Sequence, residues 1–259
     1  MYKSLLLEKE GRMTTLTLNR PEAMNSMNEV MMKELADCLE SIKNDTSVQV
    51  LLIKGEGRAF SAGGDIKAML DSENPFNMNE VMVELARIAK TLYTLPQITI
   101  AFVHGAAAGL GLSIVLGCDV IVAEESSKLA MNFIGIGLIP DGGGHFFLKE
   151  RIGISKAKQL IWEGEIFKGL EAKEIGLVDI IATDGLGWST ALSYAQRLFE
   201  SPISAMIASK EILHANQVKE LELILEKEAV KQTAMRNTID HIEGINAFVE
   251  KRKPEFRGE

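Results

Sequence analysis

Apolar residues in the first part of the chain follow two alternating spacings, one typical of strands and the other of helices. Residues 4–8 and 13–19 run apolar or alternate on either side of a turn, which predicts two paired strands. Residues 28–43 keep apolar side chains at helical spacing behind Asn28, a favourable N-cap, and residues 48–53 form a continuous apolar run. The chain is therefore expected to open as a hairpin, a helix and a buried strand.

The same alternation of strands and helices continues to about residue 185. Further strands are predicted at residues 97–103, 119–123, 128–131 and 178–182. Helices are predicted at residues 81–95, from near Gly109, and at 145–151, 156–162 and 170–175. Loops are expected at residues 135–144 and at 71–79, a polar stretch that contains Pro75 and is expected to be mobile. This order predicts an α/β fold.

From residue 188 onward the pattern predicts helices alone. Three or four helical patterns are broken at Pro202, around Gln217 and around His241, and no run predicts a strand. Such helices cannot bury their apolar stripes alone, so they are expected to pack over the core or on a neighbouring subunit. We therefore divide the chain into a core, 1–187, that binds substrate and carries the chemistry, and a helical extension, 188–259, that serves oligomerisation and closes the pocket.

Composition and charge narrow the class of protein. The 259 residues carry a net charge of −8 with dispersed basic residues, which argues against a nucleic-acid partner. Cys38 and Cys118 lie in apolar surroundings without metal-ligand spacing, which indicates reduced, buried thiols and an intracellular protein. No apolar run is long enough for a signal peptide or a membrane span. We expect a cytoplasmic protein without a membrane partner.

Two stretches of small residues, 60–67 and 104–113, each join a predicted strand to a predicted helix. Residues with almost no side chain allow another group to approach the backbone closely. The first N–H groups of a helix have no partner within the helix and lie at its positive end. Two such turns suit an oxygen anion that forms during a reaction. Tight strand-to-helix turns without a further role fit the same residues.

Nucleotide and metal chemistry fit these residues less well. Gly109-Leu110-Gly111 follows a strand, as in a dinucleotide-binding fingerprint, but Ile114 stands where the third glycine is needed. The turn after Gly57 lacks the Gly-Lys-Ser/Thr ending of a phosphate-binding loop. No pair of the four histidines has metal-ligand spacing, and no Ser-His-Asp order is evident. We therefore expect no metal and no cofactor.

Four motifs, in this order and spacing, resemble those of the crotonase family of enoyl-CoA hydratases and isomerases. They are NRPEAMN at 19–25, SAGGDIK at 61–67, the 105–119 segment and IPDGGG at 139–144, and residues 176–178 and 252–256 match as well. The resemblance covers essentially the whole chain. It implies a crotonase-type spiral of ββα units with a C-terminal helical extension, a homotrimer or homohexamer, and a coenzyme A thioester as substrate.

The resemblance also gives the two turns a role. In this family the thioester carbonyl oxygen rests between two backbone N–H groups, which by motif position belong here to Gly64 and Leu110. These groups would stabilise the oxygen as it becomes enolate-like, and loss of one such donor typically costs about 100- to 1000-fold in rate.

The chain departs from the hydratases of this family at two positions. Ser113 and Phe133 stand where the hydratases carry glutamates. Neither side chain can deprotonate water or deliver a proton to the α-carbon. Hydration is therefore disfavoured, although a hydratase with atypical acid and base residues and a non-catalytic thioester-binding protein remain alternatives.

Asp141 offers a different base. Its position resembles that of an aspartate in the isomerases of the family, and among these the ring-1,2-epoxyphenylacetyl-CoA isomerases also resemble this chain at residues 107–109, at Phe133 and at 243–248. With Gly64 and Leu110 as oxyanion donors, Asp141 would carry a proton between two carbons and so move a double bond. The alternative is that Asp141 caps the helix after Gly144.

Around this base, Phe133 and Phe146 or Phe147 are expected either to exclude water or to pack in the core. His145 would tune Asp141 or lie exposed. The resemblance also implies a groove for coenzyme A. Its candidate residues are Ala23, Met24, Ala62, Asp65, Ile66 and Lys67, with Lys67 as a phosphate partner. The basic cluster at 251–253 is better explained as a solvated face.

Overall fold

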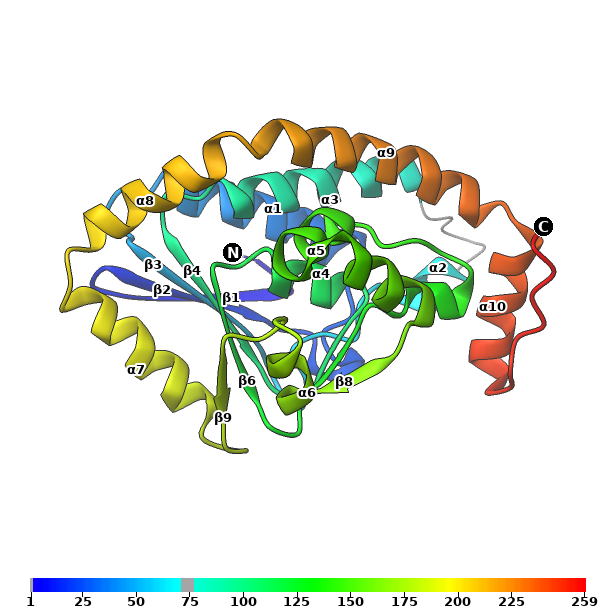
Figure 1. Cartoon of the computed structure of the whole chain (residues 1–259), viewed down its shortest axis with the longest axis horizontal. Helices are drawn as coiled ribbons and strands as arrows, with labels where there is room; N and C mark the ends of the chain where they lie inside the picture. The colour runs from blue at the N-terminus through cyan, green and yellow to red at the C-terminus, as the bar shows by residue number, and fades with distance from the viewer. Residues whose placement is uncertain (1, 71–76) are drawn as a thin grey trace.

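A six-stranded sheet forms the centre of the fold in the computed structural model, which describes residues 2–70 and 77–259 (Figure 1). The strand order is β1-β2-β3-β4-β6-β9. Only the hairpin β1–β2 is antiparallel, and the other neighbours pair in parallel. The strands are β1 (Leu5–Glu10), β2 (Met13–Leu18), β3 (Val50–Gly55), β4 (Ile98–Val103), β6 (Val120–Glu124) and β9 (Ile180–Ala182). All were predicted, within a few residues at their ends.

A second sheet, of three short strands, carries one of the glycine-rich turns. It consists of β5 (Ala106–Ala108), β7 (Lys128–Ala130) and β8 (Ile166–Lys168), in the order β5-β7-β8. The sequence predicted β7 but not β5 or β8. Three alanines have little strand propensity of their own, and β5 exists because it pairs with β7 and with Ser61.

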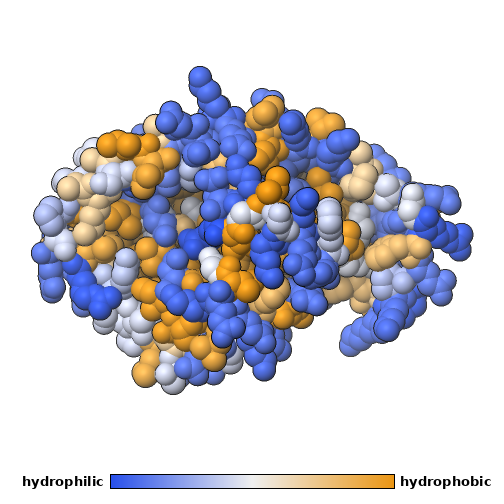
Figure 2. Space-filling model, viewed as in Figure 1, coloured by the Kyte–Doolittle hydropathy of each residue, from blue (hydrophilic) through white to orange (hydrophobic). Residues whose placement is uncertain are grey.

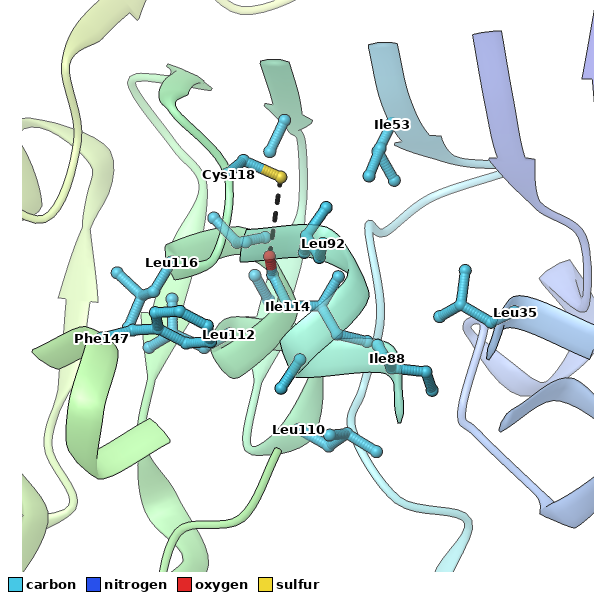
Figure 3. Packing of buried hydrophobic residues seen from close by; sticks show 14 of the residues in the cluster. Leu35, Ile53, Ile88, Leu92, Leu110, Leu112, Ile114, Leu116, Cys118 and Phe147 are labelled. Atoms are coloured by element: carbon cyan, nitrogen blue, oxygen red, sulfur yellow. Dashed lines mark hydrogen bonds between the residues drawn. The ribbon is translucent and has the colours of Figure 1, made fainter. Parts of the chain in front are cut away.

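One face of the large sheet is covered by α1 (Glu29–Lys43), α3 (Met78–Tyr93), α4 (Leu110–Leu116) and α5 (Gly144–Glu163). Asn28 caps α1 as predicted, since its side chain accepts from the N–H of Met31 at 3.0 Å. Apart from Ser113, the side chains of α4 are apolar, and Figure 3 shows its leucines and Ile114 packed among residues of α1, α3, α5 and β3. Both cysteines are free and buried, and Cys118 lies at the end of this cluster.

Some boundaries differ from those predicted. Of the expected loop 71–79, residues 71–76 lie outside the described residues, and α3 already begins at Met78. The expected loop 135–144 starts inside the short helix η2 (Asn132–Ile136). The two helices predicted at 145–162 are joined as α5, with a break at Gly153, whose φ is +73°. The remaining short elements are η1 (Pro21–Ala23), α2 (Ile66–Met69) and α6 (Gly169–Glu174).

The C-terminal part is helical, as predicted, and packs on its own core. It consists of α7 (Gly187–Phe199), α8 (Ile203–Ala215), α9 (Val218–Arg236) and α10 (Ile239–Glu250). Helix α7 covers the opposite face of the sheet, where Ala191, Ala195 and Leu198 join a second apolar cluster. Helix α9 lies along α3, and α10 packs on η2. The last break falls at Asn237 and Thr238 rather than around His241, because the Thr238 hydroxyl caps α10.

Apolar side chains also reach the surface of this helical part. Figure 2 shows hydrophobic side chains over α8, where Ile212 and Leu213 are 73% and 74% exposed. A subunit interface remains a prediction. Within residues 2–70 and 77–259, no helix has both the length and the apolar character needed to cross a bilayer.

Candidate active site

The two glycine-rich turns lie directly against each other. The N–H of Ser61 donates to Ala106 O, and the N–H of Ala108 donates to Ser61 O, both at 3.0 Å. A Cβ on Gly111 would lie 2.8 Å from Ser61 Cβ, and one on Gly63 would lie 2.7 Å from Ala108 O. The small residues of each turn are therefore needed because the other turn approaches its backbone.

This contact brings the two predicted oxyanion donors to one cavity. Leu110 is the first residue of α4, after Gly109 at φ +52°. The N–H of Met27 donates to Gly63 O, and Met27 O accepts from the N–H of Asp65. Gly64 lies between these two partners, so its own N–H takes no part in this pairing. Neither amide donates to an acceptor within residues 2–70 and 77–259. Both residues line the cavity, so their N–H groups are available to donate hydrogen bonds to an oxygen of a bound ligand.

The walls of this cavity are apolar, and one carboxylate enters it. Apolar walls come from α1, α2, α3, α4, η2, the segment after η2, and α10: Met32, Ile66, Met69, Met78, Val81, Leu85, Leu110, Phe133, Ile136, Leu138 and Phe248. The polar side chains are Asn132, Asp141, Gln232 and Arg236. Asp141 is the only acid among the described lining residues.

Asp141 lies in the turn before α5 and is 8% exposed. Its Oδ2 accepts from Gln232 Nε2 at 2.9 Å. Its Oδ1 is buried without a hydrogen-bond partner in the described part of the chain. Burial raises the pKa of Asp141 to about 7, the hydrogen bond from Gln232 opposes the rise, and the charge of Glu228 adds to it. Such a carboxyl group can take up and release a proton near neutral pH.

The alternative role of Asp141 as a helix cap is wrong. The N-cap of α5 is Gly143, whose φ is +81° and which has no side chain to cap the helix. Instead, the carboxylate of Glu228 accepts from the N–H of Gly143 at 2.8 Å and from the N–H of His145 at 3.2 Å. The Asp141 side chain is therefore not occupied by the helix start.

Ser113 and Phe133, which stand where the hydratases of the family carry glutamates, have different surroundings. Ser113 is fully buried beneath the Asp141 turn, and its hydroxyl faces Met131 Sδ at 3.9 Å, away from the described cavity lining. Phe133 does line the cavity. Phe146 and Phe147 pack in the core and are not among the described lining residues, so they act in packing rather than at the cavity wall.

The predicted coenzyme A residues are brought together in two adjoining segments. The N–H of Ala62 donates to Met24 O at 2.9 Å, which places Ala23 and Met24 beside the 62–67 segment. Ala62 and Ile66 line the cavity, and Lys67 is exposed. Asp65 instead builds the segment: it accepts from Arg20 at 3.0 Å and from the N–H of Ala68 at 3.3 Å.

One member of the basic cluster at 251–253 is engaged with acids. Arg252 forms ion pairs with Glu243 and Glu250, which fits the interpretation as a solvated face. Within the described residues, no group of three or more His, Cys, Asp or Glu side chains could hold a metal ion.

Sequence reasoning missed Glu228, Gln232 and Arg236, which approach the Asp141 turn from α9. They follow one another at four-residue spacing, and the buried face of α9 runs Leu221, Leu225, Glu228, Gln232. A polar residue at a position where the helical pattern calls for an apolar one is the signal that could have identified them.

Comparison with known proteins agrees with this geometry. The family model described as enoyl-CoA hydratase/isomerase matches residues 8–259. YhaR of Bacillus subtilis, which is named an enoyl-CoA hydratase/isomerase without a more specific activity, is 44% identical over 95% of this chain and 96% of its own. The 1,2-epoxyphenylacetyl-CoA isomerase of Escherichia coli is 33% identical over 100% of both chains.

A solved structure confirms the expected fold. The crystal structure of an enoyl-CoA hydratase from Mycobacterium avium subsp. paratuberculosis superposes with a TM-score of 0.90 at 30% identity, over 99% of this chain and 100% of the other. The mixed α/β fold with its helical C-terminal region is thus the crotonase fold. The chain belongs to the enoyl-CoA hydratase/isomerase family, whose substrates are acyl-CoA thioesters.

Proposed function

We propose that this protein moves a carbon–carbon double bond within an acyl-CoA thioester. The carboxylate of Asp141 removes a proton from one carbon of the unsaturated acyl chain. The electron pair of the broken C–H bond passes into a dienolate, whose oxygen accepts from the N–H groups of Gly64 and Leu110. Asp141 then returns the proton to another carbon, and the double bond has moved.

One observation carries this proposal: among the described residues that line the cavity together with the two amides, Asp141 is the one that carries a carboxylate. Moving a double bond needs one group that accepts and returns a proton. Hydration must also position and activate a water molecule, for which the hydratases of the family use two glutamates. Ser113 and Phe133 stand at those two positions, and their side chains can neither position nor activate the water molecule in this way. The pKa of about 7 suits Asp141 for both directions of proton transfer.

For the coenzyme A part of the substrate, we propose the groove formed by the 23–24 and 62–67 segments. Ala62 and Ile66 form its wall at the cavity, and the exposed ammonium of Lys67 is free to approach a phosphate group. Asp65 contributes by holding this segment through Arg20. The homotrimer or homohexamer and the cytoplasmic location stay predictions.

Product analysis of the wild-type protein tests the proposed function. The protein is incubated in heavy water with 3-enoyl-CoA and with 2-enoyl-CoA esters, and products are identified by mass spectrometry and NMR. The proposal expects double-bond migration with deuterium at the exchanged carbon. A 3-hydroxyacyl-CoA product would support the atypical hydratase instead, and tight binding without turnover would support a thioester-binding protein.

A further inference from the structure

Helix α9 crosses the turn that carries Asp141 and binds it through side chains that the sequence motifs did not include. Gln232 is 1% exposed and reaches two residues of this turn, Ile139 and Asp141. Buried amides are kept where their hydrogen-bonding groups are paired. All three hydrogen bonds of the Gln232 side chain go to this turn, so its position depends on the turn and the turn depends on it.

The backbone of Ile139 determines which end of the Gln232 amide faces Asp141. The N–H of Ile139 donates to Gln232 Oε1 at 3.2 Å, and Gln232 Nε2 donates to Ile139 O at 2.8 Å. A reversed amide would place donor against donor and acceptor against acceptor. The amide nitrogen therefore faces Asp141 and donates to Oδ2 at 2.9 Å.

We propose that Gln232 is a positioning residue for the proton transfer: it holds the carboxyl group of Asp141 in one orientation and favours its ionised form by donating to Oδ2. The inference rests on the proposed function of Asp141. Because Oδ1 has no partner in the described part of the chain, loss of this donor would leave the whole carboxylate buried without a hydrogen bond. A buried carboxylate in that state strongly favours protonation.

Gln232 acts through Asp141 and exchanges no proton itself. In the transfer, a C–H bond of the acyl chain breaks, the proton passes to the Asp141 carboxylate and the electron pair stays in the dienolate. In the return step the O–H bond breaks and a new C–H bond forms. Asp141 starts and ends this cycle ionised, and that is the form that an N–H donor stabilises.

Among the described residues, three other titratable or charged side chains face Asp141. The negative charge of Glu228 on α9 disfavours ionisation of Asp141, whereas His145 on α5 and Arg236 on α9 favour ionisation. The cavity walls contributed by α1, α2, α3, η2 and α10 carry no charged side chain among their described residues. Of the described residues, Gln232 alone donates a hydrogen bond to the carboxylate, which makes its effect separable.

Infrared titration of the substrate-free protein tests this role directly. The C=O band of the protonated carboxyl group is followed as pH rises, for the wild type, Gln232→Met and Gln232→Glu, each paired with its Asp141→Asn counterpart to identify the band of Asp141. The midpoint is expected to rise by about one pH unit in Gln232→Met, and further in Gln232→Glu, where the negative charge of the new carboxylate adds to the loss of the donor. At pH 7, kcat/KM should then fall roughly fivefold or more, because the ionised fraction drops from about half to about a tenth.

Glu226→Gln provides the matched control, since Glu226 lies exposed on the same helix and should leave the midpoint where it is. An unchanged Asp141 midpoint in a folded Gln232 variant overturns the inference, even if activity falls. If Gln232→Met does not fold, Gln232→Glu decides, because it keeps an acceptor for the Ile139 N–H. The titration needs no substrate, so a failed isomerase assay would overturn the proposed function without altering this result.

Discussion

His145 Nδ1 lies 2.8 Å from Glu228 Oε1, although the two residues are 83 positions apart in the chain. The same carboxylate accepts from the N–H groups of Gly143 and His145. It therefore does at the start of α5 what an N-cap side chain normally does, but from another helix. The turn that carries Asp141 is tied to α9 by Glu228 at one end and by Gln232 at the other.

Glu228→Gln is expected to lower both the stability of the fold and the pKa of Asp141. One of the two carboxylate oxygens becomes an NH₂ group that faces N–H donors, which should lower the free energy of unfolding by about 1–3 kcal/mol. Loss of the nearby negative charge lowers the pKa of Asp141. Urea unfolding and the pH dependence of kcat/KM measure the two effects. The free energy of unfolding of Glu226→Gln should stay within about 0.5 kcal/mol of wild type. Equal stability of both variants would show that Glu228 does not hold the start of α5.

The rate is expected to rise with pH through the pKa of Asp141. The proposed base must be ionised, and burial raises its pKa to about 7. A plot of kcat/KM should therefore be low at pH 5, half-maximal near pH 7 and level at higher pH. A profile that is flat between pH 5 and pH 9 would show that Asp141 is not the titrating base.

Asp141→Asn is expected to make the folded protein more stable at alkaline pH. The folded pKa of about 7 lies above the ordinary value of 3.8, so folding keeps the proton that the unfolded chain has lost. Ionised Asp141 thus lowers stability progressively as pH rises from about 4 to about 7. The variant removes this cost, on the order of 4 kcal/mol at pH 8 and little at pH 4. Unfolding curves at the two pH values measure it, and no gain at pH 8 would contradict the raised pKa.

Gly111→Ala is expected to damage activity through the oxyanion donors. The new Cβ would lie 2.8 Å from Ser61 Cβ and 2.9 Å from Ser61 O, so the two turns must separate. A displacement of this kind at a donor amide typically costs on the order of 100-fold in kcat. Ser113→Ala on the same helix is the control and should retain activity, because the one hydrogen bond of its hydroxyl within the described residues goes to Met131 Sδ. Wild-type kcat in Gly111→Ala would show that the turns do not need this approach.

The fold was predictable where local signals were strong. Asn28 caps its helix as its side chain favours, and the apolar runs of β3, β4 and β6 became buried strands. The strands β5 and β8 were missed because three alanines and the short run Ile-Phe-Lys give little strand signal of their own. Their pairing with β7, rather than their own sequence, makes them strands.

The candidate site was predictable only in part, for a similar reason. The turns holding Gly64 and Leu110 carry their own glycine signal, and Asp141 lies in a recognisable motif. Nothing near residue 141 in the sequence tells which helix covers it, so Gln232, 91 positions away, becomes visible only in the folded chain. Glu228, similarly distant in the sequence, takes the place of a capping side chain at the start of α5, so the cap role of Asp141 could be excluded only from the structure.

The most direct test of the account is the rate of double-bond migration in Asp141→Asn, measured with a 3-enoyl-CoA ester at saturating concentration alongside the dissociation constant of that ester. Asparagine preserves the shape of the side chain but cannot accept the substrate proton. A positioned general base contributes about 100- to 10 000-fold, so the account predicts a kcat loss of at least roughly 100-fold with unchanged binding. A variant that moves the double bond at the wild-type rate would contradict it.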